Sequence, residues 1–147
     1  MIGDLLLLAE IAGRIVALPA ADVASVNELE KATPVPGAPA WIVGIGTQRS
    51  RALTIIDARM ALGVGNAGEG VEHDSRYVIF AYEDHHYALR CDRILDVMPS
   101  HSDVERMPKG LGSEWMSAAT GVVETPVGAA LLLDLGACVA GPDRLAA

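Results

Sequence analysis

Two aspartates, Asp57 and Asp134, are the residues of this chain best suited to acid–base chemistry. Each follows an apolar run and precedes a short segment with helix-forming residues. Two carboxylates that face each other can act as general acid and general base. The same position suits a helix cap, because the side-chain oxygen can accept a hydrogen bond from a free N–H of the first helical turn. Since capping explains both residues without chemistry, we expect them to be structural caps.

Few side chains could hold a metal ion. His85 and His86 are adjacent, and neighbouring residues on a strand point to opposite faces, so the two imidazoles cannot share one ion. We predict no metal site and no cofactor. Cys91 and Cys138 lie in apolar stretches and lack C-x-x-C spacing, so we expect both thiols to be small core residues.

Glycine-rich and nucleophile motifs also give no support to an enzyme. The segment 63–65 ends a predicted helix, whereas a phosphate-binding loop opens one, and the segment 110–112 lacks a preceding strand and the lysine spacing of a nucleotide loop. No serine or cysteine lies in a nucleophile elbow beside a suitable base. The sequence therefore predicts a protein that is not an enzyme.

The elements that position these residues occur twice. One group of four apolar positions returns 71 residues later, and a second group that ends in Asp57 returns 77 residues later and ends in Asp134. The first group is Ala17, Leu18, Val23 and Val26, which return as Ala88, Leu89, Ile94 and Val97. The copies share their apolar pattern but not their polar residues, as expected when a duplicated unit keeps its packing while its surface diverges. Duplication of this kind favours a binding scaffold.

Each copy contains the elements of a small barrel. Hairpins are predicted at 5–18 and at 77–91, and a second strand pair at 41–56. The proline-rich segment 33–39 cannot be a central strand, because proline lacks an N–H donor. The apolar spacing of three at 23–26 and 94–97 fits either a helical turn or a bent strand. About five short strands and one small helix per copy are the content of a closed barrel.

Composition excludes several partners. Because 19 acidic residues outnumber 11 Lys and Arg, the net charge of −8 repels phosphate backbones, and we expect no nucleic acid partner. The longest apolar runs, near 5–8 and 127–133, are far shorter than the roughly 20 residues that span a bilayer, so we expect no direct membrane insertion. No positive flank of a signal peptide precedes the first run, and we expect a cytoplasmic protein.

Several spaced motifs together resemble the CheW-like domain family. They are Ala17-Leu18-Pro19, Val23 with Val26, the segment from Thr33 to Pro39, the segment from Gly44 to Ser50, and the segment from Thr54 to Ala58. The motifs occur in the family's order, and the resemblance continues through the second copy. The family turn N-L-R-G is here Thr47-Gln48-Arg49-Ser50, which keeps only the arginine.

The resemblance implies an all-β fold with short helices. Two five-stranded SH3-like β-barrels, related by internal duplication, would share a hydrophobic core. Residues 1–147 would form a single CheW-like domain, with subdomain one at about 15–75 and subdomain two at about 76–140, a division that allows strands to be exchanged at the ends.

The resemblance also implies a function. CheW-like adaptors couple bacterial chemoreceptors to the histidine kinase CheA in two-component chemotaxis signalling, and they catalyse nothing themselves. A groove between the barrels would bind the cytoplasmic tip of a receptor, and barrel-to-barrel contacts would bind the regulatory domain of CheA. Such an adaptor is cytoplasmic and is recruited to membrane receptor arrays.

Four residues carry this expectation. Receptor contact falls by motif on Val23 and Arg49, and Gly44 matches a family glycine near the barrel seam. Val26 is a further candidate, because a helical tip docks by its apolar face in a groove. Core positions are the alternative for both valines, and a solvated side chain is the alternative for Arg49.

Two other functions stay open. The altered turn at 47–50, and Ser25 in place of an acidic residue common in the family, fit a CheW-like regulator of another kinase pathway that has lost receptor coupling. The alternative from another class is a small barrel enzyme or ligand carrier, which would need a tight small ligand near His85, His86 or the aspartate pair.

Overall fold

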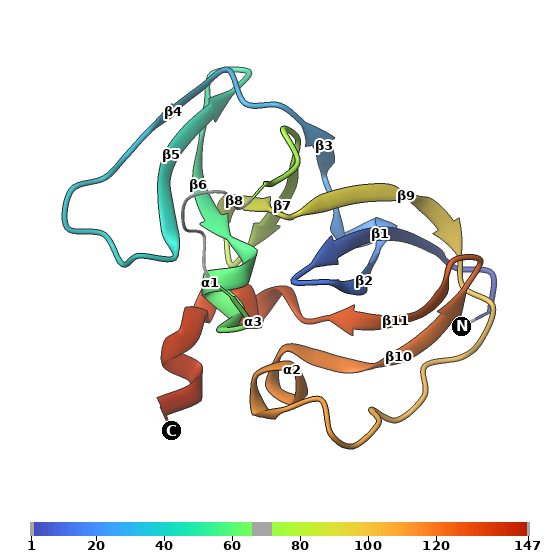
Figure 1. Cartoon of the computed structure of the whole chain (residues 1–147). Helices are drawn as coiled ribbons and strands as arrows, with labels where there is room; N and C mark the ends of the chain where they lie inside the picture. Colours follow the sequence, from blue (N-terminus) through green and yellow to red (C-terminus); the bar gives the residue numbers. More distant parts are fainter. Residues whose placement is uncertain (1, 66–71, 147) are drawn as a thin grey trace.

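The computed structural model describes residues 2–65 and 72–146. Within these residues the chain forms two curved sheets, each closing into a barrel, joined by short helices (Figure 1). The five-stranded barrel, barrel A, has the strand order β10-β11-β2-β1-β9, and the six-stranded barrel, barrel B, has the order β3-β7-β8-β6-β5-β4. The expected all-β fold is confirmed, with one additional short strand in barrel B.

The bounds of the elements are as follows. Barrel A contains β1 (Leu5–Ile11), β2 (Arg14–Pro19), β9 (Arg93–Pro99), β10 (Ala119–Thr125) and β11 (Gly128–Leu133). Barrel B contains β3 (Ser25–Asn27), β4 (Lys31–Thr33), β5 (Ile42–Gln48), β6 (Arg51–Asp57), β7 (Tyr77–Tyr82) and β8 (His85–Arg90). The α-helices are α1 (Ala58–Leu62), α2 (Ser113–Ala118) and α3 (Leu135–Ala140), and the 3-10 helices are η1 (Ala20–Asp22) and η2 (Gly141–Ala146). Among the described residues, no helix has both the length and the apolar character needed to cross a bilayer.

The two copies exchange their first hairpins. The β1–β2 hairpin of the first copy lies in barrel A, where β2 pairs in parallel with β11 and β1 pairs with β9. The β7–β8 hairpin of the second copy lies in barrel B, where β8 pairs in parallel with β6 and β7 pairs with β3. Each barrel therefore combines a hairpin from one copy with the later strands of the other.

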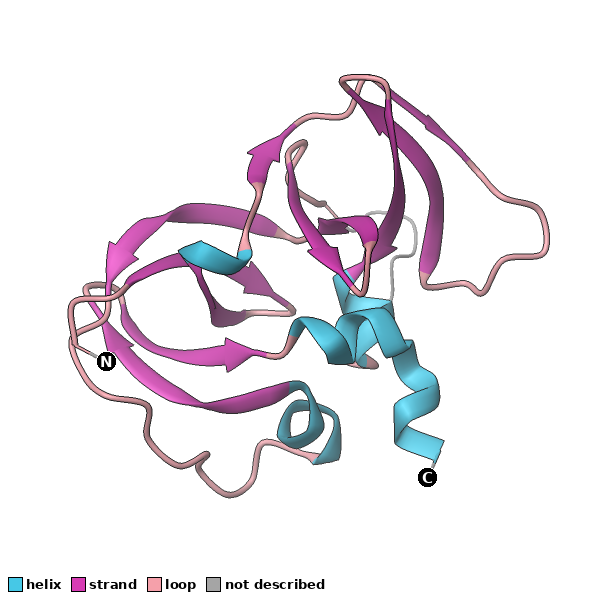
Figure 2. Ribbon diagram, turned by 180° about the vertical axis from the view of Figure 1, so that it is seen from behind, coloured by secondary structure: helices cyan, strands magenta, loops and turns pink. Residues whose placement is uncertain are grey.

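This exchange moves the boundary between the barrels away from the boundary between the repeats. Barrel B runs from Ser25 to Arg90, whereas barrel A is assembled from the two ends of the chain, as the sequence colours of Figure 1 show. Figure 2 shows the two sheets from behind. A division near residue 75 separates the sequence repeats but not the barrels. Sequence similarity identifies related segments, but hydrogen-bonded pairing decides which segments share a sheet, and each hairpin pairs with strands of the other copy.

One hydrophobic core spans both barrels. This shared core contains side chains from both exchanged hairpins, from β6 and β11, and from all three α-helices; its members include Leu7, Leu18, Ile56, Leu62, Phe80, Leu89, Trp115 and Leu133. Cys91 and Cys138 are buried in it as free thiols. Burial raises the pKa of both thiols, that of Cys138 to about 12, so both stay protonated at neutral pH.

Strand β1 is buried on both faces. Leu6 and Leu8 belong to a smaller cluster with Val123 of β10, while Leu7 and Ile11 belong to the shared core. A strand that is covered on both sides needs a continuous apolar run, because alternate side chains point to opposite faces. This requirement explains the run of leucines near the beginning of the chain.

Gly44 and Gly121 occupy equivalent positions in the two copies. Each lets a neighbouring chain segment approach the second hairpin of its copy. A Cβ atom on Gly44 would lie 2.3 Å from the backbone oxygen of Thr33. On Gly121, 77 residues later, it would lie 2.4 Å from Cγ1 of Val104 and 2.8 Å from the backbone oxygen of Glu105. Both glycines also follow a shift in strand register. The repeat therefore preserves a close approach of two backbones.

Asp74 links the segment before β7 to β9 by hydrogen bonds. Its carboxylate accepts hydrogen bonds from the backbone N–H groups of Arg76 and Ile94, each at 2.9 Å, and forms an ion pair with the Arg76 guanidinium. Burial acts to raise the pKa of Asp74, but the hydrogen bonds from Arg76 and Ile94 outweigh burial and lower this pKa to about 2. The ionised carboxylate therefore stabilises the folded state.

We expect Gly44→Ala to destabilise the protein by about 1–3 kcal/mol, because the added methyl group forces the Thr33 backbone away. Gly121→Ala should cost less, since one of its two close neighbours is a side-chain methyl group that can move. Gly65→Ala is the control, because the three atoms nearest to its Cβ are side-chain atoms of Arg59, the closest at 3.2 Å, and none is a backbone atom. Urea unfolding measures all three, and an unchanged midpoint for Gly44→Ala would contradict the close approach.

Asp74→Ala should lower the free energy of unfolding at pH 6 by about 1–2 kcal/mol. The folded-state pKa lies below the unfolded value, so this stabilisation is fully present above about pH 4 and is lost as the pH falls toward 2. Unfolding curves of wild type and variant at pH 6, 4 and 2 should therefore converge at the lowest pH. A difference that is independent of pH would show that the ionised carboxylate is not the stabilising group.

Candidate functional site

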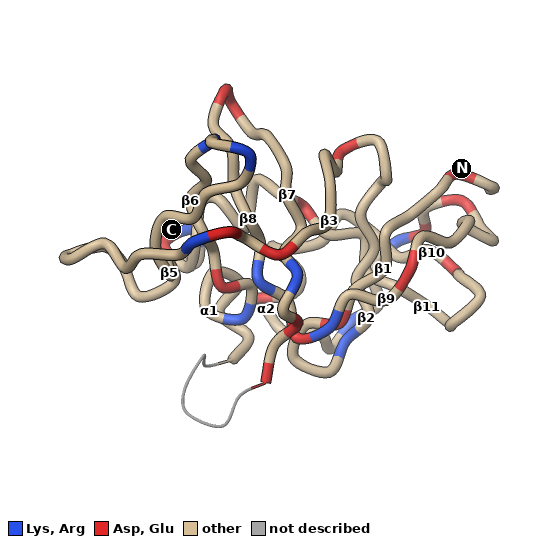
Figure 3. Tube along the Cα trace, turned by 90° about the horizontal axis from the view of Figure 1, so that it is seen from above, with Lys and Arg blue, Asp and Glu red and all other residues tan. Residues whose placement is uncertain are grey.

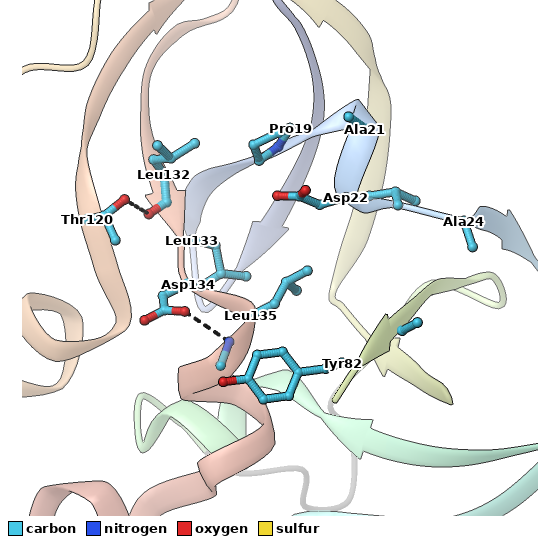
Figure 4. A pocket seen from close by; sticks show the side chains of 13 residues that line it. Pro19, Ala21, Asp22, Ala24, Tyr82, Thr120, Leu132, Leu133, Asp134 and Leu135 are labelled. Atoms are coloured by element: carbon cyan, nitrogen blue, oxygen red, sulfur yellow. Dashed lines mark hydrogen bonds between the residues drawn. The ribbon is translucent and has the colours of Figure 1, made fainter. Parts of the chain in front are cut away.

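A groove of about 650 Å³ lies between the two barrels. One side is formed by the segment that follows β2, from Pro19 to Ala24, and another by Ala81 and Tyr82 at the end of β7. The remaining side comes from β11 and the start of α3, together with Thr120 (Figure 4). Because these segments come from both barrels and both copies, the groove exists only in the assembled fold.

The groove surface is largely apolar. Val23, Leu133 and Leu135 line it, together with the ring of Tyr82. Two of its polar groups are engaged locally: the Thr120 hydroxyl donates to the Leu132 carbonyl at 3.5 Å, and the Asp134 carboxylate accepts from the Gly136 N–H at 2.9 Å. A surface of this kind suits the apolar face of a protein segment better than a charged substrate.

The equivalent place in the repeat is closed by ion pairs. Arg59 donates from Nε to Oδ1 of Asp92 at 2.8 Å, and Arg90 donates from Nη2 to Oδ2 of Asp57 at 2.8 Å. The pKa of Arg59 is raised, chiefly by its hydrogen bond to Asp92. Asp92 also accepts from the backbone N–H of Ala12 at 3.0 Å, so it ties the β1–β2 turn to α1.

The groove is open because small residues replace these charged ones. With offsets of 77 and 71 residues, the counterparts of Arg59, Asp92 and Arg90 are Gly136, Ala21 and Pro19. All three line the groove. A Cβ atom on Gly136 would lie 2.9 Å from the Tyr82 hydroxyl, so the glycine also makes room for the tyrosine ring.

The structure separates the candidate receptor residues. Both valines pack against the shared core, but only Val23 lines the groove, whereas Val26 is paired with Val78 between β3 and β7. Arg49 is exposed and lines a second hollow of about 280 Å³. Ala24 lines both hollows, so Val23 and Arg49 belong to adjoining depressions.

The altered turn keeps a tight hairpin geometry. Arg49 and Ser50 both have positive φ, 49° and 65°, as the two central residues of a type I′ turn require. The backbone N–H of Arg49 donates to Glu30 Oε1 at 3.1 Å. Arg49 is therefore held at the hairpin tip although serine stands where the family motif has glycine.

Gly44 lies inside one barrel. The nearest atoms to a Cβ at this position belong to Thr33 and Pro34, which lead from the neighbouring strand β4. The close contact that requires glycine is thus between β5 and the end of β4. Gly44 affects the barrel that carries the Arg49 turn, and its contacts do not involve the groove.

Asp57 and Asp134 cap two different helices. Asp57 accepts from the Met60 N–H at 3.0 Å at the start of α1 and is 5% exposed, while Asp134 caps α3 and is exposed. His85 lies at the β7–β8 turn, and His86 lines the smaller hollow. Within residues 2–65 and 72–146, no three His, Cys, Asp or Glu side chains are grouped so as to hold a metal ion.

Residues 5–141 match the model of the CheW-like domain family. The chain belongs to this family. It is 32% identical to the chemotaxis protein CheW of Treponema pallidum (strain Nichols) over 123 residues, which cover 78% of this chain and 71% of the relative. It is 27% identical to the chemotaxis protein CheW of Bacillus subtilis (strain 168) over 110 residues, 74% of this chain and 69% of the relative.

A solved CheW structure shows the same fold. The scaffolding protein TtCheW from Thermoanaerobacter tengcongensis superposes with a TM-score of 0.74, covering 92% of this chain and 86% of that protein at 20% identity. The pair of SH3-like barrels is therefore shared between this CheW-like chain and TtCheW.

Most residues of the groove were not predicted from the sequence. Tyr82, Gly136 and Ala21 carry no motif, and the ion pairs of Arg59 and Arg90 join residues 33 positions apart. A signal was nonetheless present. Aligning the copies with the two offsets sets three charged residues of this CheW-like chain against glycine, alanine and proline, and that asymmetry marks the open side.

We expect Asp57→Ala to destabilise the protein much more than Asp134→Ala. Removing Asp57 leaves the largely buried Arg90 guanidinium without its carboxylate, which should cost about 3–5 kcal/mol. Removing Asp134 deletes only an exposed cap, at about 0.5–2 kcal/mol. Urea denaturation of the two variants measures the difference, and equal losses would mean that the Arg90 ion pair contributes nothing beyond the cap.

Proposed function

We propose that this CheW-like chain is a non-catalytic adaptor that couples chemoreceptors to the histidine kinase CheA in chemotaxis. The observation that carries the proposal is the open, apolar groove between barrels, at a place that the repeat closes with ion pairs. Membership of the CheW-like family and similarity to two proteins named chemotaxis protein CheW support it. The adaptor acts in the cytoplasm and is recruited to receptor arrays.

The groove takes the helical cytoplasmic tip of a receptor. An amphipathic helix binds by laying its apolar face into a hydrophobic groove. Val23 and Leu135 supply apolar contact area, and Tyr82 supplies a rigid ring with a polar end. Arg49 lies in the adjoining hollow, where it meets residues of the receptor beside the helix.

Surfaces at the barrel ends bind the regulatory domain of CheA. Val127 lies at the turn between β10 and β11 and is 44% exposed, and Val97 on β9 is 46% exposed. Exposed apolar residues at rims and edges fit a protein partner. Such contacts are of modest area and exchange readily, as is usual for signalling complexes.

Ala21→Arg tests the groove. Ala21 is exposed and lines the groove, so the long charged side chain should fill it without disturbing the core. We expect affinity for a purified chemoreceptor cytoplasmic fragment to fall at least about tenfold, the effect of losing about 1.4 kcal/mol. Binding to the CheA regulatory domain should be unchanged, and isothermal titration calorimetry measures both.

Ala40→Arg is the matched control, because it makes the same change at an exposed alanine that does not line the groove. Receptor binding by Ala21→Arg at the wild-type affinity would contradict the groove as the receptor site. A wild-type protein that binds CheA but no receptor fragment would favour the CheW-like regulator of another kinase pathway.

A further inference from the structure

The smaller hollow lies at an open end of barrel B, which we call the barrel B mouth. Leu53 of β6 and Ile79 of β7 are buried and form part of its lining. Arg51 and His86 lie two positions before Leu53 and Ala88, two members of the cluster inside barrel B. Because side chains alternate along a strand, Arg51 and His86 share the inward face, and both line the mouth.

The mouth gathers cationic and hydrogen-bonding groups. Nη1 of Arg51 lies 3.5 Å from Nδ1 of His86, and Arg49, Gln48 and Ser25 complete the rim. In Figure 3 the hairpin that leads into β6 carries blue, the colour of Lys and Arg, and its cationic residues are Arg49 and Arg51. On a chain with a net charge of −8, this is a local concentration of positive charge.

Within residues 2–65 and 72–146, the cationic side chains of the mouth have no carboxylate counter-ion. Among the described residues, neither Arg49 nor Arg51 forms an ion pair with a carboxylate. The carboxylate of Glu30 contacts this turn through the backbone: its Oε1 accepts a hydrogen bond from the backbone N–H of Arg49. Both guanidinium groups are therefore available to an external anion.

The repeat shows that the fold does not require these groups. The counterparts of Arg51, His86 and Arg49 in barrel A are Gly128, Ile15 and Pro126. There the Thr125 hydroxyl donates to the Gly128 carbonyl at 2.7 Å, within the β10–β11 turn. Two barrels of the same architecture thus differ in charge at these equivalent positions, which points to a binding role for the cationic one.

We propose that the barrel B mouth binds the carboxylate of an aspartate or glutamate side chain of a protein partner. A guanidinium matches a carboxylate with two parallel hydrogen bonds. The apolar lining of Leu53 and Ile79 accommodates the aliphatic stem of that side chain, and the negative net charge of the chain disfavours a polyanion such as a nucleic acid.

Its position links the mouth to the groove. Ala24 lines both, so a segment seated in the groove can place an acidic side chain in the mouth. In this form the inference rests on the proposed function, and it adds a chemical requirement: the receptor tip carries an acidic residue at the end that lies over barrel B.

The carboxylate site can be tested without a receptor. N-acetylglutamate N-methylamide is titrated into the full-length ¹⁵N-labelled protein, with the glutamine analogue as the neutral probe and inorganic phosphate as the free-anion probe. We expect chemical-shift changes at Ser25, Ile79 and His86 with the glutamate probe, and none with the glutamine probe. Arg51→Gln should weaken glutamate binding roughly tenfold, whereas Arg14→Gln, an exposed arginine of barrel A, should not.

Three results of this titration would overturn the site. They are equal shifts with the glutamine probe, unchanged binding by Arg51→Gln with an unchanged melting temperature, or phosphate binding tighter than glutamate. Arg51 is exposed, so its variant is expected to fold.

Binding to the receptor fragment separates the site from the proposed function. If both hold, Arg51→Gln weakens receptor binding roughly tenfold, and Arg14→Gln does not. If the glutamate probe binds but wild-type protein binds no receptor fragment, the proposed function fails and the carboxylate site stands. If the receptor binds wild type and Arg51→Gln equally and the glutamate probe does not bind, the site fails and the function stands.

Discussion

The reciprocal exchange of hairpins is the constraint on which the rest of the structure depends. Each barrel is completed by a hairpin from the other copy, through the parallel pairs β2–β11 and β6–β8. The side chains of β1 divide between a cluster with β10 and the shared core, so β1 belongs at once to one barrel and to the contact between the two. Separating the barrels would expose the shared core that both of them build. The walls of the groove therefore keep a fixed spacing, which the shared core sets.

Comparison of the two copies distinguishes the residues that the fold requires from the residues that differ between its two halves. Positions that match in both copies, such as Asp57 with Asp134 and Gly44 with Gly121, serve local structure: a helix cap and a close backbone approach. Positions at which the two copies carry very different residues lie at the groove and at the barrel B mouth. A buried ion pair contributes only while both partners are present, and small residues in the same place give up contact area. Where the repeat has internal ion pairs, the open groove thus has a surface whose contacts a bound partner can supply.

Much of the fold was predictable, because apolar periodicity and motif order are local properties of the sequence. The repeat offsets of 71 and 77 residues located the related elements, and the aspartates marked the starts of α1 and α3. The predicted division allowed strands to be exchanged at the ends, but which hairpins exchange was not predictable, because strand pairing over long distances leaves no local pattern. Val23 and Val26 both pack against the shared core, and Val23 also lines the groove. The segment 23–26, which fitted a helical turn or a bent strand, contains the junction between η1 and β3.

The proposed adaptor role consists in holding other molecules in a defined relation, and it requires that the separate contact surfaces belong to one rigid body. The groove is bounded by both barrels, and the barrel B mouth adjoins it through Ala24. Asp92 and Arg59 fasten the β1–β2 turn to α1 at the place where the repeat is closed. Because packed cores resist continuous deformation, a partner seated in the groove fixes the orientation of both barrel ends. The shared core thereby converts two binding events on different surfaces into one geometric arrangement.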